Sequence, residues 1–336
     1  MREHHRAHKG AGKLKEGLLV LLGAALVLGA HGCAGSPADD EGRIGFERNS
    51  EFAGPELRVF LTLRDGRRVS VNTTDDAVDS RSAVTPIPGH QARDWTFVKE
   101  VEEGTSIAYA LVSWDGDNPA DYLMAGWWAE FPGQHLPELS FRDSIRYGIV
   151  DGPEVDPSAP PELPLEGQAT YTGRAGGLYA YVPGTDWGDD AGANVIDEYE
   201  GAITITADFA DATLRGCIGC TGDLVTRRAH FGIFLGDEVR DVRAIAAHYE
   251  LHLGVTPFNP DGTFEHVDVT VKHPERTVTH SEGFWGGLLS NIPDQDGNPR
   301  LVSGFSAADF EESDGSVGEF LGAFVALSEP FRASGR

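Results

Sequence analysis

Two cysteines separated by two residues are the pair in this chain with the clearest potential for chemistry. Cys217 and Cys220 lie in a glycine-rich stretch, residues 215–222. A CxxC pair can be a redox centre that opens a helix, half of a zinc site, or a local disulfide. The strand-like surroundings disfavour the redox centre, and no second CxxC exists to complete a zinc site. We therefore predict a disulfide between Cys217 and Cys220 that clips a turn, as expected in an oxidising compartment.

Three histidines raise the possibility of a metal or haem site. His248 and His252 would share one face of a helix, but we expect a strand over 246–254, where residues four apart are separated by roughly 13 Å. They could bind one metal ion only if the next predicted strand supplied His266. Because His248 and His252 alternate with apolar residues, we predict that they are solvated positions facing outward. His248, His252 and His266 stay candidate ligand-binding residues, and no metal is predicted.

Three acidic turns raise the possibility of calcium binding. Residues 186–190, 259–262 and 294–298 combine Asp or Asn with Gly, but none has the spacing and terminal Glu of an EF-hand loop. We predict turns held by local hydrogen bonds, and no cofactor. Trp187 lies in the first of these turns with little to bury it, so it is a candidate partner-binding residue. The other tryptophans are predicted core residues.

The chain shows no signature of an enzyme. The serine hydrolase, zincin, P-loop and dinucleotide motifs are all absent from the sequence. The net charge of −26 argues against a nucleic-acid partner and favours a soluble monomer. We predict a protein without catalytic activity.

The first 33 residues, 1–33, are typical of a lipoprotein signal peptide. A basic start precedes an apolar run from Gly17 to Ala30, too short for the roughly 20 residues that span a bilayer. Cys33 then lies where a lipoprotein signal peptidase would cut, although Ala30 and His31 depart from the usual lipobox. We predict that Cys33 becomes an acylated N-terminus; ordinary secretion and a retained anchor are the alternatives.

The residues after Cys33 indicate in which membrane the protein is anchored and how the anchor is joined to the folded part. Ala34 follows the cysteine in place of the aspartate that favours inner-membrane retention, so we expect anchoring in outer-membrane lipid. Residues 34–50 combine small and acidic residues and are predicted to be a flexible tether.

Residues 51–150 form the first predicted domain, and a period of two within them predicts that it is a small β domain. The alternation from Leu57 to Leu63 and the Asp65–Gly66 turn predict a hairpin. Residues 72–93 are predicted to be a loop. A three-strand meander is expected after it, over 95–102, 105–114 and 121–131. The third of these strands is apolar on both faces, so both faces should be covered.

Residues 151–164 are rich in proline and acids and are predicted to be the linker to a second domain, 165–330. Glycines recur inside the predicted strands of that domain. They favour a small closed barrel, because glycine lets strands bend and approach one another closely. Its eight predicted strands are 169–181, 203–209, 213–217, 246–254, 266–272, 283–290, 301–307 and 319–327. The last strand is apolar on its outer face too, so we expect the first domain to pack there. The predicted fold class is thus all-β, with a small N-terminal β meander domain packed on a C-terminal eight-stranded antiparallel β-barrel.

The order of several motifs resembles the transferrin-binding protein B-like β-barrel family. The opening motifs are Gly167 to Gly173, Gly177 to Tyr179, Gly201 to Phe209 and Leu214 to Gly216. The closing motifs are Gly283 to Gly287, Val302 to Gly304 and Phe320 to Phe324, and Tyr122 to Trp128 is similar to a segment before the barrel. The resemblance implies a surface lipoprotein of the outer membrane with a β handle and an eight-stranded barrel.

The resemblance does not imply a particular ligand. Members of the family bind host transferrin, haemoglobin, haem or complement factor H, and the transferrin-binding members have two lobes where this chain has one. We expect a binding module whose partner is a protein or a haem- or iron-bearing ligand. The alternative is a structural or assembly lipoprotein of the envelope without a diffusible ligand.

Overall fold

The computed structural model describes most of the chain after the predicted tether. The described residues are 43–45, 50–63, 66–82, 90–136, 139, 144–156, 158–184, 195–222, 224–227, 248–266 and 268–329. The predicted signal peptide with Cys33, and Trp187, lie outside them. None of the helical segments in this described part has the length and apolar character that a membrane crossing requires.

A six-stranded sheet forms the middle of the N-terminal half. Its order is β1-β9-β8-β7-β6-β5, and β6, β7 and β8 are the predicted meander. The strands are β1 (Arg43–Gly45), β5 (Ala77–Ser82), β6 (His90–Val101), β7 (Gly104–Asp115), β8 (Tyr122–Pro132) and β9 (Ile145–Asp151). Part of the segment expected to be a tether is therefore β1, which pairs with β9 in parallel.

The prediction of a loop over 72–93 was wrong in part. Ala77–Ser82 forms β5, and β6 already begins at His90. Among the described residues, β5 lies at the edge of the sheet and pairs with β6 alone. Polar and charged residues are tolerated there, because an edge strand has one side facing solvent. The sequence therefore looks like a loop, whereas its pairing makes it a strand.

A second, three-stranded sheet contains the predicted hairpin. It consists of β2 (Ser50–Ala53), β3 (Glu56–Thr62) and β4 (Arg68–Asn72) in sequential order. Leu57, Val59 and Leu61 are buried and point to the same core as Trp95 and Trp128 of the six-stranded sheet. The hairpin and its inward-facing alternation are confirmed.

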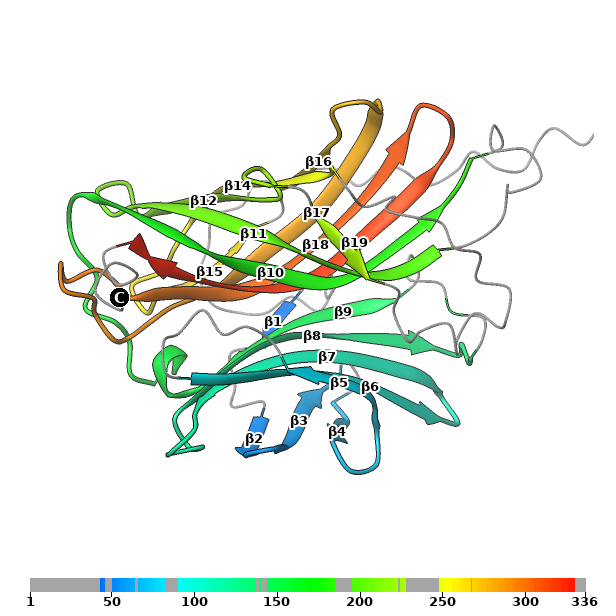
Figure 1. Ribbon diagram of the computed structural model, residues 1–336, viewed down its shortest axis with the longest axis horizontal. Helices are drawn as coiled ribbons and strands as arrows, with labels where there is room; N and C mark the ends of the chain where they lie inside the picture. The colour runs from blue at the N-terminus through cyan, green and yellow to red at the C-terminus, as the bar shows by residue number, and fades with distance from the viewer. Residues whose placement is uncertain are drawn as a thin grey trace, which may run out of the picture. The chain divides into compact units, whose positions relative to one another are not determined.

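The C-terminal half is a curled antiparallel sheet that forms a half-barrel (Figure 1). Its path is β15-β17-β18-β19-β10-β11-β12-β14-β16, with β13 attached to β11. Its strands are β10 (Gln168–Val182), β11 (Val195–Asp208), β12 (Thr213–Ile218), β13 (Val225–Arg227), β14 (Glu250–Pro257), β15 (Thr263–His266), β16 (Val269–Lys272), β17 (Val278–Leu289), β18 (Leu301–Glu312) and β19 (Val317–Ser328).

The strand predicted over 266–272 is divided in two. β15 ends at His266 and pairs with β17, whereas β16 begins at Val269 and pairs with β14. Asp268 lies between them, and its backbone carbonyl accepts a hydrogen bond from the amide of Gly254. β15 and β16, which follow each other closely in the sequence, are therefore the two ends of the strand path.

Glycines allow neighbouring strands of the curled sheet to lie very close. A Cβ at Gly177 on β10 would collide with the carbonyl oxygen of Leu321 on β19, and one at Gly287 would collide with that of Ser303 on β18. Such close approach of backbones is the predicted reason for glycine inside these strands.

The two faces of β8 are both buried, as the sequence predicted. Tyr122, Met124 and Trp128 pack toward the three-stranded sheet. The residues between them face the curled sheet instead, where Trp127 packs with Leu321, and Leu123 packs with Leu327. The apolar outer face of β19 is therefore covered by β8, which lies within residues 51–150, as the prediction of packing there required.

The predicted linker, 151–164, is packed between the two halves at its start. A 3-10 turn, Pro153–Val155, follows β9, and its Glu154 and Val155 are buried. Val155 joins the apolar contact between β8 and β19, and the backbone carbonyl of Glu154 accepts a hydrogen bond from the amide of Asn291. The start of the linker thus belongs to the core.

Candidate functional site

The structure separates the two histidines that were predicted to share one strand. β14 begins at Glu250, so His248 lies in a turn, where its φ of +72° is left-handed, and the prediction of a strand from residue 246 was wrong. A left-handed residue interrupts the extended backbone, which explains why the strand starts later. His252 is on β14 and half-buried, with Leu251 and Leu253 buried beside it, so the outward orientation of His252 is confirmed.

The register also separates His266 from His252. His252 pairs with Thr270 on β16, whereas His266 pairs with Trp285 on β17. The backbone register therefore gives His252 and His266 different partner strands, and it does not support the alternative in which His266 joins the other two histidines at one metal ion. His248 has its ring 6.2 Å from that of His273 instead.

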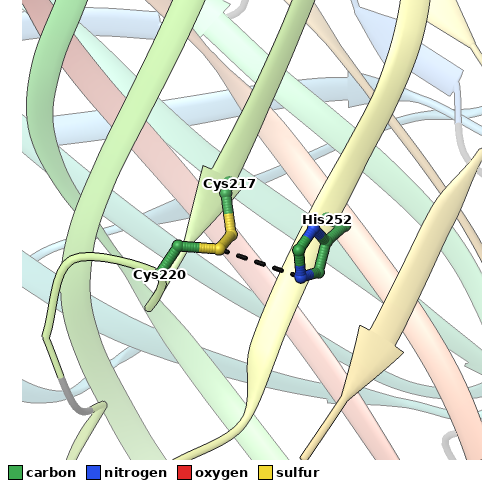
Figure 2. Close-up of side chains that lie close together, drawn as sticks. All are labelled: Cys217, Cys220 and His252. Carbon is green, nitrogen blue, oxygen red and sulfur yellow. Dashed lines mark hydrogen bonds between the residues drawn. A yellow bond between two sulfur atoms is a disulfide. The ribbon is translucent and has the colours of Figure 1, made fainter.

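His252 lies beside Cys217 and Cys220, a contact that was not predicted from the sequence. Cys217 on β12 is the direct cross-strand partner of His252 on β14. The Nε2 atom of His252 is 3.8 Å from the Sγ atom of Cys220, and Cys217 and Cys220 form a disulfide (Figure 2). We call Cys217, Cys220, His252 and Glu250 the outer-face cluster.

A turn that requires glycine brings Cys220 back over the sheet. Gly219 has a φ of +87°, and a Cβ there would crowd the backbone oxygen of Tyr249 and the side chain of Leu224. Its amide donates a hydrogen bond to the carbonyl of Ala202. The sequence between the cysteines therefore bends the chain so that Cys220, which is exposed, meets a histidine on a different strand.

Glu250 provides a carboxylate to the same histidine. Its Oε2 atom is 2.9 Å from the Nε2 atom of His252, two residues further along β14. An ionised carboxylate only accepts hydrogen bonds, so the Nε2–H group of His252 donates to it. One sulfur, one imidazole nitrogen and one carboxylate oxygen thus converge on the outer face.

The ligand atoms of Cys217, Cys220 and His252 all lie within 4.8 Å of one another. Sulfur and imidazole nitrogen are the donors that zinc prefers. In the oxidised form the two sulfurs bind each other, so the disulfide and a metal ion would compete for them.

A second group of metal-binding type was missed by the sequence reasoning. His90, Asp115 and Asp121 also bring their ligand atoms within 4.8 Å of one another, and all are half-buried. Burial lowers the pKa of His90, while Asp121 and Asp115 oppose that change. His90 was not singled out because it lies in the segment that was predicted to be a loop. In the sequence, the acidic turn after β7 was the only feature that could have indicated this group.

The interior of the curled sheet is filled by aromatic side chains. Tyr179, Tyr249, Phe310, Phe320 and Trp285 are all fully buried in one cluster. The rings of Tyr179 and Phe320 lie with their centroids 4.7 Å apart, and those of Tyr249 and Phe310 lie 4.9 Å apart. This is the packing of a core, in the part of the interior that the structure describes.

A buried carboxylate lies within this interior. Glu312 accepts hydrogen bonds from the hydroxyl of Tyr181 at 2.8 Å and from that of Tyr249 at 2.6 Å. Arg276 is 3.5 Å from the same carboxylate. Burial raises the pKa of Tyr181 to about 12 and that of Tyr249 further, because the charged phenolate would be desolvated beside a carboxylate.

The described acidic turns are held by local hydrogen bonds, as predicted. The Oδ1 atom of Asp294 accepts from the amides of Asp296 and Asn298, and that of Asp261 accepts from the amide of Thr263.

The tryptophans predicted to be core residues are all buried: Trp95, Trp114, Trp127, Trp128 and Trp285.

No protein-family model matches this chain, and no curated protein matches it significantly.

Proposed function

We propose that this chain is a surface lipoprotein of the outer membrane that binds a partner protein and carries out no catalysis. In this proposal Cys33 carries the lipid, and the β strands from residue 50 onward present the binding surface. The fold would be the handle and eight-stranded barrel of the transferrin-binding protein B-like family.

The pairing at residues 263–272 supports a closed barrel. β15 pairs with β17 at one end of the strand path, and β16 pairs with β14 at the other. If residues 263–272 count as one strand, the circuit runs through eight strands and returns to its start. The sheets formed by β1–β9 would then be the handle, packed on the outside of β17, β18 and β19.

The filled interior of the curled sheet is the main reason for proposing a protein as the partner. A small ligand such as haem needs a concave cavity, whereas large aromatic side chains occupy the described interior. The wall at β18 and β19 is already covered by β8 and β9. A partner would therefore bind on the outer face or at the connecting loops, surfaces suited to a protein.

The net charge argues against a nucleic-acid partner, and the disulfide favours a location outside the cytoplasm. The chain carries a net charge of −26, which repels other polyanions and favours partners with basic surfaces. The disulfide between Cys217 and Cys220 suits an oxidising compartment.

The anchoring is tested by expressing the full chain and a Cys33→Ser variant in a bacterium with an outer membrane. We expect the unmodified chain to incorporate labelled fatty acid, to fractionate with the outer membrane and to be cleaved by protease added to intact cells. The variant should be released in soluble form. Equal fractionation of both chains would contradict the proposed anchor.

The choice of partner class is tested with haemin as the small-molecule probe. We expect no stoichiometric haemin binding and no quenching of the buried Trp285, and we expect cross-linking on intact cells to trap a protein. Stoichiometric haemin binding with quenching would overturn the protein-binding proposal. Recovery of a constant, equimolar envelope protein would favour the structural or assembly role instead.

A further inference from the structure

The outer-face cluster contains a complete set of zinc donors, which come from two adjacent strands, β12 and β14, and from the turn that follows β12. Cys217 and His252 are cross-strand partners, and the Gly219 turn places Cys220 next to the same imidazole. Glu250 approaches the imidazole from two residues away on β14. Two thiolates, one imidazole and one carboxylate would make a four-coordinate site.

The distances are close to those that a zinc ion requires. With Zn–S bonds of about 2.3 Å and Zn–N bonds of about 2.0 Å, tetrahedral ligands lie roughly 3.5 Å apart. The Sγ atom of Cys220 and the Nε2 atom of His252 are 3.8 Å apart in the disulfide form. Side-chain rotations alone could therefore bring these two donors onto a common metal ion.

A disulfide that only clips a turn has no need of the other two side chains. The imidazole and the carboxylate are half-exposed, on the outer side of the sheet, away from the apolar core that fills the interior. Their convergence on the sulfur gives the cluster a donor set beyond what the disulfide requires.

We propose that the outer-face cluster is a redox-controlled zinc site, closed by the Cys217–Cys220 disulfide and opened when that disulfide is reduced. The reductant is a dithiol. It transfers two electrons and two protons to the disulfide, becomes a disulfide itself, and leaves two cysteine thiols. Zinc then displaces the two thiol protons to solvent, and the proton on the Nε2 atom of His252 moves through solvent to the Nδ1 atom of the same ring. The metal ion binds both thiolates together with the freed Nε2 atom and the carboxylate of Glu250. This inference is independent of the proposed partner-binding function.

The test uses the full chain with Cys33→Ser, so that only Cys217 and Cys220 can supply thiolates. After reduction and anaerobic removal of the reductant, Co²⁺ is titrated as a spectroscopic substitute for zinc. We expect one Co²⁺ per chain, with strong tetrahedral d–d bands and thiolate-to-cobalt charge-transfer bands that zinc abolishes. The oxidised chain should show neither. Absence of these bands from the reduced chain would overturn the proposal.

Variants separate a metal site from two free thiols. His252→Ala should weaken Co²⁺ binding at least about tenfold and change the d–d bands, and Glu250→Gln should weaken it by a smaller factor. Neither side chain is in the core, and circular dichroism checks that both variants fold. An unchanged affinity in His252→Ala would refute the site.

The chain supplies a matched control on another strand. His280 and Glu282 on β17 form a similar histidine–carboxylate pair, with 3.8 Å between Nε2 and Oε2, and both are exposed. No cysteine lies near them in sequence. His280→Ala should leave the affinity and the spectrum unchanged; a loss equal to that of His252→Ala would place the metal elsewhere and refute the assignment.

Discussion

Glu154, in the turn after β9, and Arg300, just before β18, form a buried ion pair between segments that are 146 residues apart. The Nε atom of Arg300 donates to the Oε2 atom of Glu154 at 2.7 Å, and its Nη2 atom contacts the other carboxylate oxygen. Glu154 is only 2% exposed. The pair therefore fixes the start of the predicted linker to the curled sheet.

Glu154→Ala should destabilise the protein by about 3 kcal/mol, because it removes the buried carboxylate that compensates the desolvation of the Arg300 guanidinium. The measurement is the free energy of unfolding in denaturant. Replacing Arg300 by Met in the same chain should restore part of the loss. As a control, Glu51→Ala removes the exposed Glu51–Arg58 pair and should cost less than about 1 kcal/mol. Equal costs for the two single variants would show that the buried pair has no special role.

Stability should fall at alkaline pH as the buried tyrosines ionise. The pKa of Tyr181 is raised from 10.0 to about 12, so the unfolded chain releases this proton at lower pH than the folded chain. The contribution of Tyr181 is therefore complete below pH 10 and is lost as the pH rises toward 12.

Tyr181→Phe isolates this contribution. The variant should be less stable than the unmodified protein at pH 7, by about 1–3 kcal/mol, because a hydrogen bond to a charged carboxylate is lost. The difference should shrink between pH 10 and pH 12, which denaturant unfolding at several pH values measures. A difference that stays constant over this range would contradict the raised pKa.

Gly177→Ala should destabilise the curled sheet by about 2 kcal/mol or more, because its Cβ would collide with the backbone of Leu321 and neither strand can move away. Gly116→Ala is the control. Its Cβ would meet only the side-chain end of Gln91, which is exposed and can move, so the cost should stay within about 0.5 kcal/mol. Thermal unfolding of both variants measures this, and a tolerated Gly177→Ala would mean that the strands are further apart than described.

The pKa of His90 should report on its neighbours. Burial lowers it below 6.5, Asp121 raises it, and Arg300 lowers it. Asp121→Asn should therefore lower the pKa further, and Arg300→Met should raise it, as measured by NMR titration of the imidazole. A shift of the opposite sign in either variant would show that the group is arranged differently.

The period-two patterns predicted most of the strands because alternation is a local property of the sequence. Leu57, Val59 and Leu61 point to one side wherever the hairpin packs. The two apolar faces of β8 and β19 likewise required coverage on both sides, and this is why their packing against each other could be predicted.

The errors occurred where pairing decides the structure. β5 is polar and becomes a strand only by pairing with β6. His248 lies in a left-handed turn although its neighbours look extended. The division of 263–272 between two partners depends on strands far away in the sequence.

By itself, the amino-acid sequence determined the all-β class, the buried faces of the main strands and the turns that join them, because each follows from neighbouring residues. Only the tertiary structure decided that His252 meets Cys220 and that Glu154 meets Arg300. The physical reason is register: a shift of one residue between two strands turns every side chain to the other face, and strand register depends on long-range packing that no local pattern encodes.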